Sequence, residues 1–143
     1  MRFTRKFLLS VLPLAAGLAA MPALAGDVSD AVSGLASAEG KLNVALFDKA
    51  AGFPKGKFTL GQIVPAAKGT VNLVFKDVAP GAYAVSVFHD VNDNGRLDAN
   101  MVGIPSEPYG FSRDARGVMG PPKFEDAAVT VGAEPLKLAI QIK

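Results

Sequence analysis

Residues 71–87 have the sequence VNLVFKDVAPGAYAVSV, in which two runs of alternating apolar residues flank a turn. In each run the apolar side chains recur at every second position, which is typical of a strand with one buried face. These positions are Val71, Leu73 and Phe75 in the first run and Tyr83, Val85 and Val87 in the second. Pro80 and Gly81 predict a tight reversal between the two strands, because proline presets φ and glycine tolerates a positive φ.

The same alternation recurs after Gly26 and predicts an all-β domain. Two further clear runs cover residues 42–46 and 136–142, and weaker candidate strands cover 28–34, 57–60 and 127–131. Single helical turns are expected at most at 48–51 or 124–128. About seven short strands without a long helix favour a two-sheet β-sandwich. An up-and-down barrel is the alternative, but the spacing of the strands is uneven.

The composition limits the domain organisation and the function. The chain has 143 residues, no cysteine and one histidine, and residues 26–143 carry a formal net charge of −1. One domain over 26–143 is long enough to bury a core, and no nucleic-acid partner is expected. The composition excludes a cysteine nucleophile, a zinc–cysteine cluster and a multi-histidine metal site.

Residues 1–25 match a secretory signal peptide, because basic residues precede an apolar stretch that ends in an A-x-A site. The basic residues are Arg2, Arg5 and Lys6, the stretch is 7–20, and the site is Ala23-Leu24-Ala25. We predict cleavage after Ala25 and a mature protein in the periplasm or outside the cell, with no membrane span. The alternative is an uncleaved anchor, since residues 7–25 are about long enough to cross a bilayer, although Pro13 and Pro22 suit a cleavage site better.

Residues 90–98, DVNDNGRLD, have the spacing of a calcium loop of the EF-hand type. In such a loop side-chain oxygens at positions 1, 3, 5 and 9 and a carbonyl at position 7 face the ion, and a glycine at position 6 allows the turn. The side-chain oxygens at positions 1, 3, 5 and 9 belong to Asp90, Asn92, Asn94 and Asp98. The carbonyl at position 7 belongs to Arg96, and the glycine at position 6 is Gly95. Oxygen ligands of this kind select calcium, so the motif predicts a calcium site.

The motif departs from the EF-hand pattern at position 12, where Met101 replaces the bidentate glutamate. Glu107 is the nearest downstream carboxylate and the candidate replacement. With only Asp90 and Asp98 as certain anionic ligands, we expect a weak dissociation constant on the order of 10⁻⁴ to 10⁻³ M. The alternative is a bare hairpin turn at residues 92–95, for which Asn-Gly is a strong signal.

Residues 90–126 predict a long ordered loop, because they combine many Gly, Pro, Asn and Asp residues with apolar anchors. The anchors are Tyr109, Phe111, Met119 and Phe124. Tyr109, Phe111, Arg113 and Arg116 are also candidates to line a groove for a carbohydrate, a peptide or an anionic head group. The alternative is that the aromatic rings pin the loop and that the arginines pair with acidic neighbours. Those neighbours are Asp114, Glu125 and Asp126.

His89 precedes Asp90 and is a candidate general base. Neighbouring residues of a strand point to opposite faces, so Asp90 cannot orient His89 unless the chain turns there. A structural role is therefore favoured.

A further set of residues covers nearly the whole mature chain. It comprises 44–48, 77–78, 80–81, 83–85, 88–90, Asn92, 94–95, 97–98, 103–105, Glu107, 109–112, 120–122, Phe124 and 126–128. In these residues the chain resembles the bacterial exported proteins of the domain of unknown function 2141 family. The resemblance implies a transthyretin-like or immunoglobulin-like sandwich in the periplasm, and it implies no particular activity.

Two functions are compatible with these features. The first is a non-enzymatic, calcium-stabilised module that binds or supports a protein or glycan of the cell envelope. The second is a periplasmic hydrolase acting on an envelope glycan or ester, with His89, Asp90 and Arg113 or Arg116 as its polar centre. A pocket that holds His89 and an arginine would favour the hydrolase. A small-molecule carrier would need an apolar cavity, for which the sequence offers no test.

Overall fold

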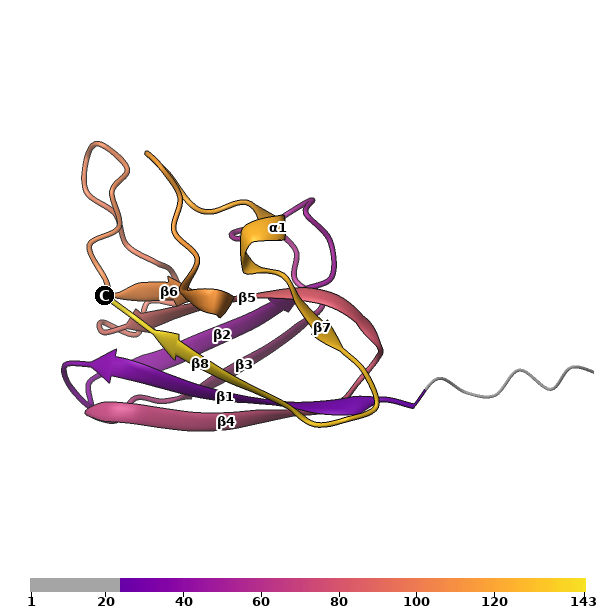
Figure 1. Ribbon diagram of the computed structural model, residues 1–143. Helices are drawn as coiled ribbons and strands as arrows, with labels where there is room; N and C mark the ends of the chain where they lie inside the picture. The colour runs from indigo at the N-terminus through magenta and orange to yellow at the C-terminus, as the bar shows by residue number, and fades with distance from the viewer. Residues whose placement is uncertain (1–23) are drawn as a thin grey trace, which may run out of the picture.

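Two open sheets pack face to face as a β-sandwich in residues 24–143, the part of the chain that the computed structural model describes (Figure 1). The strands are β1 (Gly26–Leu35), β2 (Lys41–Phe47), β3 (Leu60–Pro65), β4 (Gly69–Val78), β5 (Gly81–Asp90), β6 (Tyr109–Phe111), β7 (Val129–Val131) and β8 (Leu136–Gln141). One sheet has the order β4-β1-β8, and the other has the order β3-β2-β5-β6 with β7 also paired to β5. The sandwich prediction is confirmed and the barrel alternative is wrong. The predicted signal peptide lies almost wholly outside the described residues.

Strand β1 is the centre of the three-stranded sheet, antiparallel to β4 and parallel to β8. Its weak sequence signal arises from Asp30, which takes an inward position between Val28 and Val32. The strand expected at 57–60 is displaced, because β3 begins only at Leu60, opposite Leu46 of β2. It is a largely exposed edge strand that ends in Pro65, where a missing N–H is tolerated.

The predicted reversal at Pro80 and Gly81 is present, but it carries the chain from one sheet to the other. Strand β4 ends at Val78 and pairs with β1, whereas β5 begins at Gly81 and pairs with β2. The Tyr83 hydroxyl donates to the Ala79 carbonyl at 2.7 Å and so fastens this crossing. The connection therefore closes one end of the sandwich and is not a hairpin.

The apolar alternation of both sheets fills the space between them, and a second, smaller core covers the outer face of β5. The second core contains Ala84, Phe111 and Ala127, with Phe53, Tyr109, Ala115 and Phe124 packed against it. It anchors the long loop through η1 (Ser112–Asp114) and α1 (Phe124–Ala127). The helical turn expected at 124–128 is confirmed, whereas 48–51 is not helical. Met119 was expected as an anchor but is fully exposed, because it lies in a bend over residues 118–120 that packs on neither core.

Ser112 joins three segments beneath this second core. Its buried Oγ accepts the Val85 N–H at 2.9 Å and donates to the Ala127 carbonyl. The hydroxyl therefore holds η1 between β5 and the end of α1.

Ser112→Ala should lower the free energy of unfolding by about 1–3 kcal/mol, because it leaves a buried N–H and a buried carbonyl without a partner. Chemical denaturation measures the change. Ser106→Ala, at an exposed serine, is the matched control and should be close to neutral. Equal stability of the two variants would contradict this role of Ser112.

Asp30 is the one strongly perturbed carboxyl of the main core. It is 1% exposed, and neither of its oxygens has a hydrogen-bonding partner in the described part of the chain. Burial raises the pKa of Asp30 to about 7. In the folded state this carboxyl therefore keeps its proton over a pH range in which the unfolded chain has lost it.

Because the folded state binds the extra proton between about pH 4 and pH 7, the free energy of unfolding should fall as pH rises through this range and then level off. The full change is roughly 4 kcal/mol at most, since one pKa unit is about 1.4 kcal/mol. Denaturant titrations across this range measure it, and Asp30→Asn should remove this contribution.

Asp27→Asn on the same strand is the control. The hydrogen bond from Lys76 lowers the pKa of Asp27, which is the opposite direction to Asp30. The Asp27→Asn variant should therefore still show the free energy of unfolding falling between about pH 4 and pH 7. An Asp30→Asn variant with the wild-type pH profile would show that Asp30 is ionised in the folded protein.

Candidate functional site

The loop after β5 is shaped by the carboxylate of Asp90, the last residue of that strand. This buried carboxylate accepts the main-chain N–H of Asn94 at 3.1 Å and of Gly95 at 2.7 Å. Gly95 has a φ of 79° and Asp93 a φ of 55°, a region that glycine and aspartate adopt more readily than most residues. The main chain thus turns sharply at Asp93 and Gly95, where the calcium-loop spacing requires a turn.

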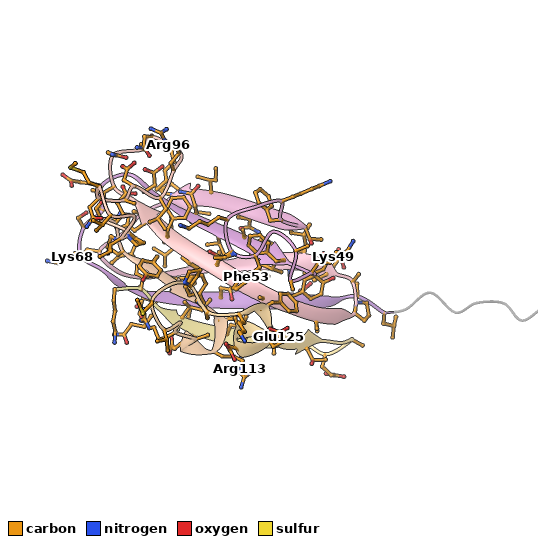
Figure 2. All side chains as sticks on the ribbon, turned by 90° about the horizontal axis from the view of Figure 1, so that it is seen from above. Lys49, Phe53, Lys68, Arg96, Arg113 and Glu125 are labelled. Atoms are coloured by element: carbon orange, nitrogen blue, oxygen red, sulfur yellow. The ribbon has the colours of Figure 1, made fainter. Side chains whose placement is uncertain are left out.

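Three side chains of the loop converge on one point. The amide groups of Asn92 and Asn94 lie 2.6–2.9 Å from the carboxylate oxygens of Asp98. The hydrogen bonds from Asn94 and then Asn92 lower the pKa of Asp98, so this group is ionised at neutral pH. Positions 3, 5 and 9 of the predicted motif therefore do come together, while Arg96 extends outward from the molecule (Figure 2).

Glu107 lies at the base of the loop and joins its two ends. One carboxylate oxygen accepts the Val91 N–H at 3.0 Å and the other accepts the Asp98 N–H at 3.0 Å. Glu107 was predicted as a replacement ligand, and that role stays a prediction. Its direct contacts, however, are with main-chain N–H groups, so its first effect is to close the loop.

The turn between β1 and β2 packs against the start of the loop at residues 90–98. Gly40 has a φ of 68°, and a side chain there would collide with the main-chain carbonyls of Asp90 and Val91. Lys41, at the start of β2, pairs with the carboxylate of Asp93, which has no hydrogen bond to the converging side chains, at 3.3 Å. Gly40 is a position that shapes the loop and that the sequence pattern did not reveal, because close approach of two main chains leaves no periodic signal.

The donor set fits a weakly held hard cation. Turning the Asn92 and Asn94 amides about their terminal bonds would present oxygen where each now presents nitrogen, next to the Asp98 carboxylate. Within residues 24–143, no three His, Cys, Asp or Glu side chains gather as a metal-binding group. A cation here would thus depend on amide and carbonyl oxygens together with one well-placed carboxylate, a low-charge set that calcium tolerates.

His89 is buried and has a structural partner. Its Nε2 donates to the Glu39 carbonyl at 2.6 Å, and since a carbonyl only accepts, Nε2 carries the proton. Its main-chain N–H donates to the Pro108 carbonyl at 2.9 Å. These contacts tie β5 to the β1–β2 turn and to the segment before β6.

The aromatic candidates pack inward, and the arginine candidates remain exposed. Tyr109 contacts Phe111 edge to face at a ring separation of 5.8 Å, and Phe53 contacts Phe111 at 5.7 Å. The expected ion pairs of Arg113 and Arg116 are wrong for the described residues, whose ion pairs are Lys41–Asp93 and Lys76–Asp27. The reason is that two of the predicted partners accept main-chain N–H groups instead. Asp114 accepts the N–H of Gln141, and Asp126 accepts that of Lys123.

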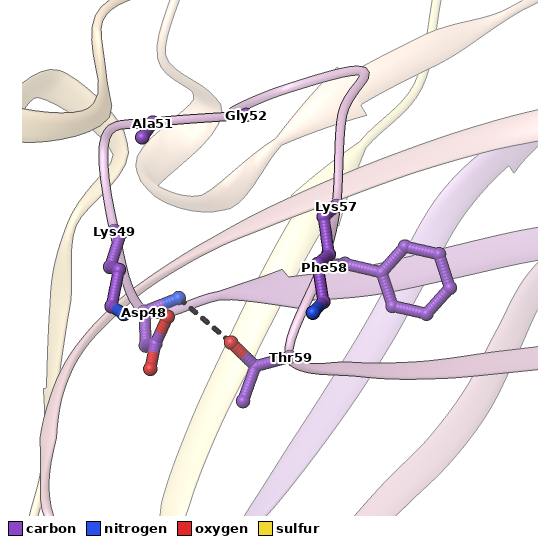
Figure 3. Close-up of a pocket in the computed structure, with 7 residues that line it drawn as sticks. All are labelled: Asp48, Lys49, Ala51, Gly52, Lys57, Phe58 and Thr59. Carbon is purple, nitrogen blue, oxygen red and sulfur yellow. Dashed lines mark hydrogen bonds between the residues drawn. The ribbon is translucent and has the colours of Figure 1, made fainter.

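An open hollow of about 580 Å³ lies beside the β2–β3 connection (Figure 3). It is lined by Asp48, Lys49, Ala51, Gly52, Lys57, Phe58 and Thr59, with the Asp48 N–H donating to the Thr59 hydroxyl at 3.2 Å. It contains neither His89 nor an arginine. The polar centre that the hydrolase hypothesis requires is not assembled in this hollow.

Comparison with known proteins agrees with the resemblance seen in the sequence. No curated protein and no solved structure matches the chain. A family model described as an uncharacterized protein conserved in bacteria, DUF2141, matches residues 31–139. That span runs from β1 into β8 and includes the whole loop with Glu107. The chain therefore belongs to this family of uncharacterized bacterial proteins.

Proposed function

We propose that this chain is an exported, non-enzymatic β-sandwich module of the cell envelope, whose loop at residues 90–98 binds calcium weakly and which binds or supports an envelope protein or glycan. The convergence of Asn92, Asn94 and Asp98 carries the calcium part of this proposal. A simple turn needs only the contacts that Asp90 makes with the main chain. A turn alone does not require the three converging side chains, and for this reason they support a binding role.

The number of available oxygens suits calcium, which takes six to eight ligands. Asp98 and the two amides supply side-chain oxygens, and the Arg96 carbonyl and water complete the set in the manner of an EF-hand loop. The few formal charges favour a dissociation constant on the order of 10⁻⁴ to 10⁻³ M. Such a site would fill only where calcium is abundant, as outside the cytoplasm.

Three observations support the exported and non-enzymatic parts of the proposal. Strand β1 begins at Gly26, directly after the expected cleavage point, so removal of residues 1–25 would leave every described strand intact. The helices within residues 24–143 are too short to span a bilayer. His89, the sole imidazole of the chain, is buried and hydrogen-bonded, which favours a structural over a catalytic role.

Calcium should raise the thermal midpoint of the mature chain, residues 26–143, relative to the midpoint in chelator. Binding to the folded state alone adds about 2.7 kcal/mol at a hundredfold excess over the dissociation constant. Differential scanning calorimetry over a calcium series measures the increase, with magnesium as the ion control. Asp98→Asn should abolish most of it.

Asp93→Asn is the matched control in the same loop, because Asp93 faces Lys41 and not the converging side chains. It should keep the calcium-dependent increase. No increase at millimolar calcium, or the same increase in Asp98→Asn, would refute the site and reduce the motif to a turn.

A further inference from the structure

Two loop tips expose large apolar side chains to solvent. The first tip, residues 99–105, presents Met101, Val102 and Ile104, and the second tip, residues 116–120, presents Val118 and Met119. Both methionines are fully exposed, and Ile104 is 60% exposed. Scattered single apolar residues on a surface are ordinary, but five gathered at two apices indicate a contact surface.

Both tips point in the same direction. In Figure 1 they rise above β6, away from the β4-β1-β8 sheet, and they are the highest parts of the described chain. Their apices reach nearly the same level in this view, so a single flat surface can touch both. A flat surface is what a membrane offers.

The first tip satisfies most of its own main-chain N–H groups. The Asn100 side-chain oxygen accepts the N–H groups of Val102 and Ile104 at 3.0 Å each. The Asn100 N–H donates to the Ile104 carbonyl at 2.8 Å, and the Gly103 N–H donates to the Asn100 carbonyl at 3.0 Å. These hydrogen bonds lower the cost of leaving water at the N–H groups, because unpartnered main-chain groups make entry into lipid costly.

The second tip is a tight turn that holds its side chains outward. A side chain at Gly117 would collide with the carbonyls of Gly120 and Pro121, so the chain closes on itself there. Met119 has a φ of 58° within this turn, and its side chain is fully exposed.

The charges near the tips also suit a lipid surface. Residues 99–106 and 115–122 contain no carboxylate, and their single charged residue is Arg116. Arg116 is exposed and has no ion-pair partner among residues 24–143. Its guanidinium is therefore available to a lipid phosphate.

We propose that the two tips insert shallowly into the interface of a lipid bilayer, with Arg116 beside the head-group phosphates. Two separate convex tips would need two matching pockets on a protein partner, whereas a bilayer accepts flexible apolar side chains without a complementary shape. The calcium proposal is not required for this contact, because the hydrogen bonds that shape the first tip lie C-terminal to the loop at residues 90–98.

Co-sedimentation with vesicles tests the proposal on the processed chain, residues 26–143, which contains every described strand. Vesicles of phosphatidylethanolamine and phosphatidylglycerol are compared with vesicles of phosphatidylcholine alone. The wild-type chain should bind both, and the anionic vesicles more strongly. The double variant Met101→Ser, Met119→Ser should need roughly tenfold more lipid for half-binding, and Arg116→Gln should lose the preference for anionic vesicles.

Ile104→Ser and Ile63→Ser form a matched pair, because their isoleucines are 60% and 65% exposed and Ile63 lies on β3, far from the tips along the chain. Only Ile104→Ser should weaken binding, and neither should change the thermal midpoint. All samples are measured in chelator and again in calcium, so failure of the calcium site does not affect the result. Absence of vesicle binding, equal weakening by Ile63→Ser, or tip variants that alter self-association in ultracentrifugation instead would overturn the proposal.

Discussion

The arrangement of the loop at residues 90–98 and of the first tip depends on the hydrogen bonds that the Glu107 carboxylate accepts. It accepts the N–H of Val91, the residue after β5, and the N–H of Asp98, the residue before the first tip. Two charge-assisted hydrogen bonds, both accepted by this one buried carboxylate, fix the separation of these points. With the base closed in this way, the segment 91–98 can bring its polar side chains together and the following residues can project as a tip.

Most of the fold could be predicted from the sequence, because a two-sheet sandwich gives half-buried strands a period of two. The strand predictions were weak or displaced where a buried polar residue or an exposed edge interrupts this period. Asp30 interrupts it in β1 by occupying a core position, and β3 lacks a clear pattern because an edge strand buries little. Assignment of β4 and β5 to different sheets could not be predicted either, since the alternating residues do not reveal which strand pairs with which.

The candidate site was predictable to the extent that its geometry is local. Asn92, Asn94 and Asp98 converge, and Asp90 holds the main chain of the turn between them, because a nine-residue spacing determines how the loop folds. The contacts of Glu107 with main-chain groups join residues distant in sequence, and these leave no signature in a single chain. The exposure of Met119 was also missed, because an apolar residue in a long loop has the same sequence signal whether it packs inward or faces solvent.

Amide hydrogen exchange at Val91 and Asp98 tests the closure by Glu107 most directly. The account predicts that both amides are protected in the wild-type chain and that Glu107→Gln accelerates both together by about tenfold or more, because one glutamine oxygen cannot replace two acceptors. The amide of Val87 within β5 should keep its protection, as should all three amides in Glu125→Gln, an exposed control. Exchange at the rate of an unfolded chain in the wild type, or no acceleration in Glu107→Gln, would contradict the account.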